Sequence, residues 1–354
     1  MFQVLACGAA IVTLSMGIRH GFGLWLQPIT QEMGWTRQSF ALAIAIQNLS
    51  WGVIGIFVGM VADRFGAFRV LIGGAVLYGL GLAGMALSPT PTLFALTAGV
   101  LIGAAQAGTT YAVIYGVLGR QIAPERRSWA MGVAAAAGSF GQFLMVPVEG
   151  WLISSLGWQQ ALLALSLMVL LIVPLAFGLR EPGFHASTPA RRDQTIVQAL
   201  GEAFRYPSFL LLTAGYFVCG FQVVFLGVHL PSYLKDQQLP ATVATTALAL
   251  IGLFNIFGSY SVGWLGQRWS KAYVLAGIYG LRALVMLAFI SVPPSALSVG
   301  LFACAMGFLW LSTVPPTNGI VAQMLGVRFL SMLGALVFLS HQLGSFAGVW
   351  RAGR

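Results

Sequence analysis

Charge is what this sequence has least of. Asp, Glu, Lys and Arg make up only 7% of its 354 residues, whereas a soluble domain carries about 25% charged residues. Hydrophobic residues make up 58%, and the mean hydropathy is +0.87. Such a chain cannot cover a water-facing surface with polar side chains, so a soluble domain is excluded and an integral membrane protein is expected.

Acidic residues are scarcer than basic ones. There are 8 Asp and Glu against 18 Lys and Arg, which gives a formal net charge of +10. In a soluble chain this excess would suggest a nucleic-acid ligand. In a membrane chain, basic loops and lipid phosphates account for it better, so we expect contact with membrane lipids and no nucleic acid.

Cysteine is also rare. Cys7, Cys219 and Cys304 lie far apart in apolar runs, which excludes a disulfide framework. No cluster of His, Cys and acidic residues has the spacing of a metal or catalytic site, so we expect no metal, no cofactor and no enzyme. The N-terminus lacks a basic stretch before its long apolar run, which favours a retained first helix over a cleaved signal peptide.

What the sequence has instead is long apolar runs. A spanning helix needs roughly 20 apolar residues, and the sequence predicts such helices over residues 2–29, 39–62, 68–87, 92–118, 128–154, 158–179, 208–234, 241–266, 272–291, 296–324 and 329–350. Charged residues gather between the sixth and seventh runs. We therefore expect an N-terminal six-helix bundle at 1–180, a cytoplasmic linker at 181–206 and a C-terminal bundle at 207–354.

The basic residues also predict the orientation. If the N-terminus is cytoplasmic, the opposite side has only Arg37 and Lys235 in its loops. The cytoplasmic loops and linker then carry Arg64, Arg69, Arg120, Arg126, Arg127, Arg180, Arg191, Arg192, Arg205, Arg268, Lys271 and Arg328. This positive-inside bias predicts a multi-pass protein of the cell (inner) membrane with its N-terminus inside.

A short charged motif stands out between the second and third runs. Residues 59–71 read G-M-V-A-D-R-F-G-A-F-R-V-L, and 263–271 read G-W-L-G-Q-R-W-S-K, a weaker echo 204 residues later. The two segments resemble the loops that follow helices 2 and 8 in the major facilitator superfamily. The resemblance implies a gating role for Gly59, Asp63, Arg64, Gly66, Arg69 and Arg268.

The echo is part of a longer repeat. Pro28 corresponds to Pro231 and Gly103 to Gly307, again at about 203 to 204 residues, and parallel repeats of six helices are the construction of the superfamily's two halves. The sixth helix has no partner in the second half. The expected fold is therefore an all-α major facilitator fold of two pseudo-repeated six-helix bundles, with about 11 of 12 helices present.

Two further segments indicate a branch of the superfamily. Residues 126–141, R-R-S-W-A-M-G-V-A-A-A-A-G-S-F-G, resemble the helix 5 signature of monocarboxylate transporters, and 20–25 loosely resemble their helix 1 signature. Residues 251–266 resemble their helix 8, although Asn255 and Ser259 stand where that family usually has an acid and an arginine. His341 falls near a lysine of the related oxalate–formate antiporters.

Polar residues inside the predicted spans are the candidates for chemistry, because burying them in a bilayer is costly. Arg19 could clamp a carboxylate, or could instead bond helix-end carbonyls. His341 could carry a proton, or could be a packing residue. Glu149 could carry protons instead of His341, although we expect it to be exposed at the rim. Arg282 is expected to serve pairing or packing, with substrate contact as the alternative. The proposed substrate ligands are Arg19, Tyr111, Tyr115, Asn255, Ser259 and Asn318, with proton coupling at His341.

Three functions are compatible with this pattern. The first is a secondary transporter of a small organic anion, monocarboxylate-like, coupled to protons or to exchange, working by alternating access. The second is a drug or amphiphile exporter of the same fold, although the Gly-Pro pair of that class is absent because Pro147 stands apart from Gly141. The third is a truncated remnant that does not transport. The sequence does not indicate an oligomeric state.

Overall fold

Helices account for nearly all of the described chain. The computed structural model describes residues 2–181 and 195–352, and within them eleven helical segments are long and apolar enough to cross a membrane. No strand occurs in those two ranges. The prediction of an all-α membrane protein with eleven spans is confirmed.

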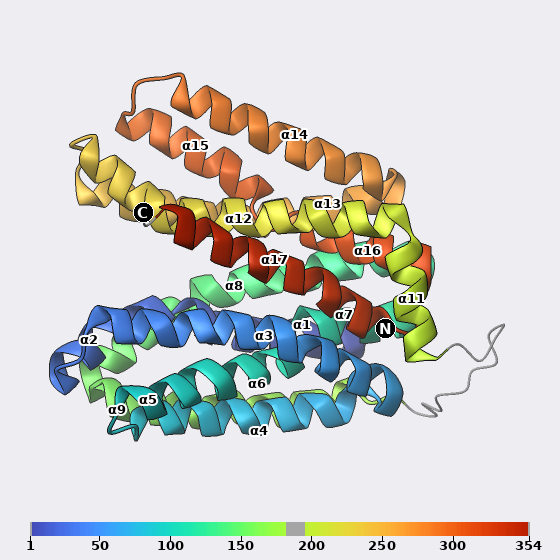
Figure 1. The fold of residues 1–354 in the computed structure, drawn as a ribbon, viewed down its shortest axis with the longest axis horizontal. Helices are drawn as coiled ribbons and strands as arrows, with labels where there is room; N and C mark the ends of the chain where they lie inside the picture. Colours follow the sequence, from blue (N-terminus) through green and yellow to red (C-terminus); the bar gives the residue numbers. More distant parts are fainter. Residues whose placement is uncertain (1, 182–194, 353–354) are drawn as a thin grey trace.

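The first six spans form one bundle, drawn in blue to green in Figure 1. Most of its long helices end at a glycine or a threonine. Its elements are α1 (Phe2–His20), α2 (Phe22–Met33), α3 (Arg37–Phe65), α4 (Ala67–Ala86), α5 (Pro91–Phe94), η1 (Ala95–Leu101), α6 (Ile102–Thr109), α7 (Tyr111–Gln121), α8 (Pro124–Leu156), α9 (Trp158–Met168), η2 (Val169–Leu171), α10 (Ile172–Ala176) and η3 (Phe177–Leu179).

The other five spans form a second bundle beside the first, drawn in yellow to red in Figure 1. Its elements are α12 (Pro207–Asp236), α13 (Ala241–Arg268), α14 (Lys271–Ile290), α15 (Ala296–Leu309), α16 (Val314–Leu325) and α17 (Leu330–Ala352). The two bundles pack together mainly where α3 meets α17 and where α8 meets α13. The paired-bundle arrangement is the one that the repeat in the sequence predicts.

A short helix occupies part of the predicted linker. α11 (Ile196–Arg205) begins with a capping box: the Gln198 N–H donates to Thr195 Oγ1 at 3.2 Å, and the Thr195 N–H donates to Gln198 Oε1 at 2.8 Å. Figure 1 places α11 next to the start of α12, at the end of the molecule where α7 finishes. Residues 182–194 of the linker lie outside the described residues.

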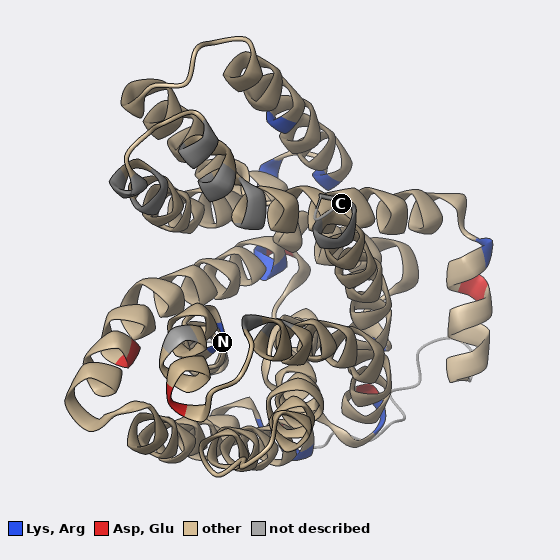
Figure 2. Ribbon diagram, turned by 60° about the vertical axis from the view of Figure 1, so that its left-hand side comes forward, with Lys and Arg blue, Asp and Glu red and all other residues tan. Residues whose placement is uncertain are grey.

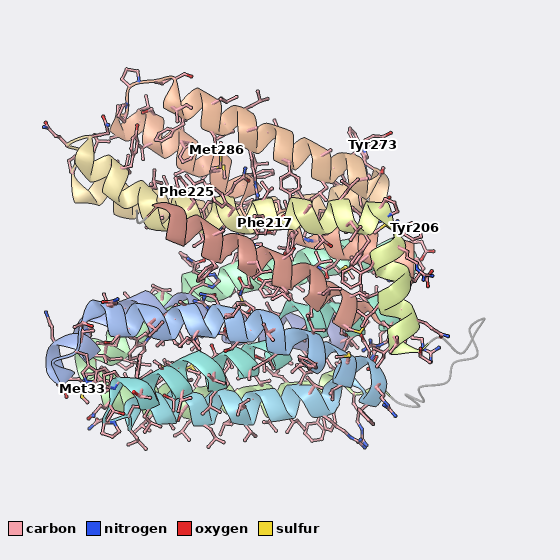
Figure 3. The ribbon with its side chains drawn as sticks, viewed as in Figure 1. Met33, Tyr206, Phe217, Phe225, Tyr273 and Met286 are labelled. Atoms are coloured by element: carbon pink, nitrogen blue, oxygen red, sulfur yellow. The ribbon has the colours of Figure 1, made fainter. Side chains whose placement is uncertain are left out.

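The outer surface of the bundles is apolar. Phe217 of α12 and Tyr273 of α14 project from the ribbon in Figure 3, with 37% and 80% of their surface exposed. In Figure 2, where Lys and Arg are blue and Asp and Glu are red, charged residues are sparse along the ribbon. Apolar side chains of this kind suit a lipid solvent rather than water. The helices can lie in lipid because they satisfy their backbone hydrogen bonds internally.

Two glycine contacts let the bundles approach each other. A Cβ on Gly59 of α3 would lie 2.7 Å from the Cα of Met332 in α17, and a Cβ on Gly132 of α8 would lie 2.6 Å from the Cα of Gly263 in α13. Both distances are too short for real atoms. Only a residue without a side chain allows the helices to cross this closely.

Three spans are broken in their interior. The first bends at Gly21 between α1 and α2, and the fourth breaks at Thr110, whose backbone is extended with φ −116° and ψ −162°. The tenth breaks between α15 and α16. Pro315 and Pro316 lie in the first turn of α16, where a missing N–H costs no helical bond, so the interruption of this span falls just before them.

Candidate functional site

A pocket lies between the two bundles and is walled by both of them. Its empty volume is about 390 Å³, part of which is open to solvent. Four aromatic rings and one amide dominate its walls. The lining residues from the first bundle are Trp51, Thr110, Tyr111 and Ala112, and those from the second are Tyr216, Val314, Asn318, Gly334, Val337 and Phe338.

The pocket sits at two of the helix breaks. Thr110, Tyr111 and Ala112 form the break before α7, and Val314 is the first residue of α16. These positions are related by the 204-residue repeat, so the fourth and tenth spans open at equivalent points on opposite walls. The N-termini of α7 and α16 therefore both border the pocket, and a helix N-terminus favours negative charge.

Arg19 lies beside one wall of the pocket. Its Nη2 donates to Asn48 Oδ1 at 2.7 Å, and its guanidinium carbon is 6.0 Å from the ring centroid of Trp51. The Arg19 Nε is buried without a hydrogen-bond partner. Arg19 thus has donor capacity left over next to the pocket, and it bonds an amide rather than helix-end carbonyls.

The rings of the two candidate tyrosines contact each other at a tilt of 37°. The ring centroids of Tyr111 and Tyr115 are 5.6 Å apart. Tyr111 lines the pocket, and its hydroxyl lies against Gly138 of α8, where a Cβ would collide with it. Tyr115 is fully buried behind it, with a hydroxyl that has no partner. Tyr111 and Asn318 therefore line the pocket, whereas Tyr115 packs behind Tyr111.

His341 lies one layer behind the opposite wall. Its ring stacks on Phe338 at 5.6 Å with an interplanar angle of 11°, and its centroid is 5.0 Å from that of Tyr216. The His341 Nδ1 is buried without a partner. His341 contacts two lining residues but does not itself line the pocket.

Asn255 and Ser259 are engaged elsewhere. The Asn255 Nδ2 donates to Ser139 Oγ of α8 at 2.7 Å, while its Oδ1 accepts from the Leu311 N–H at 2.9 Å and from Ser259 Oγ at 3.3 Å. Both residues are buried and absent from the pocket wall. In this conformation they join the two bundles and satisfy a backbone group freed by the break before α16.

A charged cluster closes one end of the interface between the bundles. Asp63 accepts from Arg120 Nη1 at 2.8 Å, and its two oxygens accept from the Met332 and Ser331 N–H groups at 2.8 and 3.3 Å. Arg120 Nε also donates to Glu181 at 2.9 Å. We call Asp63, Arg120, Glu181 and the first turn of α17 the Asp63 latch. It ties the first bundle to the N-terminus of a helix in the second.

The other predicted gating residues have different places. Gly66 joins α3 to α4 with φ +87° and ψ 148°, a conformation that glycine adopts without strain. Arg64, Arg69 and Arg268 are exposed. Arg64 lies over the Phe65 ring and Arg268 over the Trp264 ring, so within the described residues neither forms an ion pair.

The comparisons with known proteins identify the family. The family model described as Major Facilitator Superfamily matches residues 5–349. The chain belongs to this superfamily. The predicted resemblance is therefore confirmed at the level of the family.

Relatives within the superfamily include carriers named for carboxylates. The chain is 27% identical over 358 residues to monocarboxylate transporter 11 of Mus musculus, covering 98% of this chain and 78% of that protein. It is 25% identical over 366 residues to the gallate transporter of Pseudomonas putida, covering 87% and 78%.

Solved superfamily structures share the fold. The E. coli fucose:proton symporter FucP superposes with a TM-score of 0.78 at 16% identity, covering 100% of this chain and 91% of that one. A bacterial homologue of the iron transporter ferroportin, in an outward-facing state, also gives a TM-score of 0.78, at 17% identity and 99% and 92% coverage. At these identities the likeness shows the architecture alone.

Several residues of the Asp63 latch and of the pocket wall were not identified from the sequence. Arg120 appeared only as a loop charge and Glu181 was not singled out, although both complete the Asp63 latch. Trp51, Tyr216 and Phe338 looked like ordinary apolar helix residues, although they wall the pocket. Their spacing gave no signal, because a pocket-lining aromatic and a packing aromatic occupy the same kind of helical position.

One expectation was wrong. Glu149 is not exposed at the rim of α8 but fully buried, with 0% of its surface accessible. Its Oε2 accepts from Trp25 Nε1 at 2.9 Å, and its Oε1 has no partner. The first and fifth spans pack through Gly17 and Gly141, which brings α8 so close to α1 that Glu149 is enclosed.

Arg282 has the packing role expected of it. It is fully buried in α14 and donates from Nε to the Leu309 carbonyl at 3.1 Å and from Nη2 to the carbonyls of Leu309 and Trp310. These carbonyls lie at the C-terminal end of α15, where the helix break leaves them without helical partners. Among residues 2–181 and 195–352, no three His, Cys, Asp or Glu side chains group closely enough to hold a metal ion.

Proposed function

We propose that this superfamily member is a secondary active transporter of a small organic anion, a carboxylate of the monocarboxylate type, and that the pocket between the bundles is its binding site. The proposal has transport proceed by alternating access, with the two bundles rocking about the pocket. Proton coupling or exchange supplies the driving force.

The observation that carries the proposal is the position of the pocket. It lies between the two repeats, at equivalent breaks in the fourth and tenth spans, with Arg19 beside it. A guanidinium inside a membrane bundle is costly unless it serves a purpose. Two helix N-termini and one incompletely bonded arginine on the same pocket together favour an anionic ligand. Relatives named for monocarboxylates and for gallate agree with this class.

The geometry supports a proposed role for each residue around the pocket. Arg19 binds the carboxylate once its bond to Asn48 loosens, and Tyr111 and Asn318 orient the remainder of the molecule from opposite walls. Tyr115 fixes Tyr111, and His341, behind Phe338, is a candidate for the coupling proton. Asn255 and Ser259 remain candidate ligands for the alternate conformation, in which the Asn255–Ser139 bond has to break.

Gating is assigned to the Asp63 latch. In this conformation the latch holds the bundles together at one end, so the proposal has substrate exchange through the opposite end. Most loop arginines lie at the latch end of the spans, and by the positive-inside rule we place that end and the N-terminus on the cytoplasmic side of the inner membrane. Opening toward the cytoplasm then requires Asp63 to release α17.

Counterflow in proteoliposomes tests the proposal. Labelled lactate, pyruvate and benzoate are exchanged against the unlabelled acid with the wild type and with Arg19→Ala. Loss of a charge-assisted hydrogen bond of about 2 kcal/mol lowers the apparent affinity roughly 30-fold. Arg205→Ala removes an exposed arginine from α11 and serves as the control. Unchanged exchange by Arg19→Ala removes Arg19 from the site.

The aromatic walls of the pocket give a specific reason to test the alternative function, a drug or amphiphile exporter. Trp51 and Phe338 contact each other across the bundle interface at 4.7 Å, and planar amphiphiles stack well on such rings. The same vesicles are therefore challenged with a lipophilic cationic dye. Dye exchange without carboxylate exchange would favour an exporter, and a folded protein that exchanges neither would favour a chain that does not transport.

A further inference from the structure

Glu149 is a carboxyl group in the interior of the first bundle that has no charge partner among residues 2–181 and 195–352. It lies within the span formed by α8, none of its surface is accessible, and only one of its oxygens is hydrogen-bonded. The single donor is the neutral indole N–H of Trp25. In the described part of the chain, both salt bridges involve Arg120 of α7, which lies near the start of α8, so no cation neutralises Glu149.

The carboxyl group packs against the bend in the first span. A Cβ on Gly21, the residue between α1 and α2, would collide with the Glu149 carboxyl group. The backbone at the bend and the acid are therefore in direct contact. Arg19, the proposed ligand of the substrate carboxylate, is two residues before this bend.

The neighbouring elements supply few charges near this acid. From α1, Arg19 bonds Asn48, and His20 Nδ1 bonds the Met16 carbonyl. From α4, Tyr78 donates to the Ser15 carbonyl. α9 and α16 carry no charged residue. The charged groups of α7 and α13, Arg120 and Arg268, lie toward the opposite end of α8, where Ser128 meets Gly266.

Elementary electrostatics then fixes the form of the acid. An isolated carboxylate without water or a cation is very costly in a low-dielectric interior, and such groups remain neutral instead. The carboxylate is stable only if the surrounding helices move and admit water. The bend at Gly21 is the element whose movement would do so, because its backbone covers the acid.

We propose that Glu149 is a proton-binding site of the transport cycle. In the conformation described here it holds the proton as a neutral acid. When the first span moves about Gly21, the O–H bond breaks heterolytically, the proton passes to water, and the carboxylate stays behind. That carboxylate competes for Arg19, so Arg19 accepts the substrate only while Glu149 is protonated. Proton and anion therefore move together.

This inference rests on the proposed function for its coupling, but the proton site itself can be tested without any substrate. Infrared spectroscopy of the purified full chain at neutral pH shows a carbonyl band when a carboxyl group is protonated. The band is expected in the wild type and lost in Glu149→Gln. Glu32→Gln is the matched control, since Glu32 accepts from Trp158 Nε1 at 2.7 Å in a similar Trp–Glu pair but is exposed.

The amide of Glu149→Gln keeps the shape and the oxygen that accepts from Trp25, so the variant should fold. Size-exclusion chromatography verifies this. Trp25→Phe removes the one hydrogen-bond donor that the described residues give the acid. It provides a second variant, in which the band is expected to shift rather than vanish. Absence of any band in the wild type, or its persistence in Glu149→Gln, would overturn the proton site.

Coupling is tested in proteoliposomes. With one proton per anion, an inward gradient of one pH unit drives about tenfold accumulation, since about 1.4 kcal/mol is a factor of ten. Wild type and Glu32→Gln should accumulate labelled benzoate to this extent, and uptake should fall as pH rises. Glu149→Gln should accumulate none and should show uptake that does not vary with pH.

The outcomes separate the two proposals. Full accumulation by Glu149→Gln overturns its role in coupling, and if His341→Gln abolishes accumulation instead, the proton site of the cycle is His341. If the wild type exchanges no carboxylate at all, the proposed function fails. In that case an infrared band that depends on Glu149 still supports the proton site.

Discussion

The two glycine-bounded loops of the repeat follow the same kind of close helix crossing but differ in chemistry. Gly59 brings α3 against α17, and Gly263 brings α13 against α8, each with no room for a Cβ. Four residues after each glycine the halves diverge. Asp63 is 6% exposed and binds α17 and Arg120, whereas Gln267 at the equivalent position is exposed.

The difference between Asp63 and Gln267 shows that close crossing of the helices and closure of the interface are separate requirements. Close crossing of the helices needs glycine on both sides, because backbones must touch for the bundles to pack in lipid. Holding the interface closed needs charge on one side only. Asp63 satisfies two backbone N–H groups at the start of α17, which is where a carboxylate is most favourable.

The equivalent helices α4 and α14 also share a position in the repeat but differ in chemistry. Tyr78 of α4 and Arg282 of α14 are 204 residues apart, and both are fully buried against a broken span. Tyr78 accepts from Gln106 at 3.4 Å just before the break at Thr110, whereas Arg282 binds the carbonyls that end α15. The repeat preserves the position, and each half supplies its own polar group.

Removing the charge of Asp63 should have the largest effect on the closed interface between the bundles. Asp63→Asn leaves Arg120 and the α17 N-terminus without their buried anion, which costs about 3 kcal/mol, or roughly 150-fold in the closed-to-open ratio. The measurement is the labelling rate of Ser331→Cys, a position buried between the bundles. Glu125→Gln, which removes an exposed acid near the start of α8, is the control and should leave the rate unaltered.

Breaking the glycine side should have an intermediate effect. Gly132→Ala places a Cβ 2.6 Å from the Cα of Gly263, so α8 and α13 must separate, at about 2 kcal/mol. Thermal unfolding in detergent should show a lower melting temperature. Gly150→Ala on the same helix meets no atom within 4 Å and should melt as the wild type does. Equal melting of the two variants would mean that the crossing is not tight.

Restoring the missing acid should have the smallest effect. Gln267→Asp recreates the Asp63 position in the second repeat, opposite the first turn of α8. Because Gln267 is exposed, the added charge should stabilise the closed form by only about 0.5 kcal/mol at low salt, and less as salt rises. The same cysteine-labelling assay detects it. An effect as large as that of Asp63→Asn would show that the two loops are interchangeable after all.

Most of the fold could be predicted because lipid imposes simple rules. Residue runs of spanning length and the glycine-bounded motif were enough to identify eleven spans and the superfamily. The site was harder. Tyr111 and Asn318 were identified as polar residues in central helices, whereas Trp51 and Phe338 were not identified as pocket residues. The sequence does not show whether an aromatic side chain in a membrane helix faces a pocket, lipid or another helix.

Sequence alone determined the membrane class, the number of spans and the repeat, because hydrophobicity, length and the spacing of glycines are local properties of the chain. Tertiary structure alone decided which polar groups were already satisfied. Asn255 is engaged by Ser139 and Leu311, Asp63 by α17 and Arg120, while Glu149 is enclosed with one oxygen unbonded. These partners lie more than fifty residues away along the chain, and only packing brings them together.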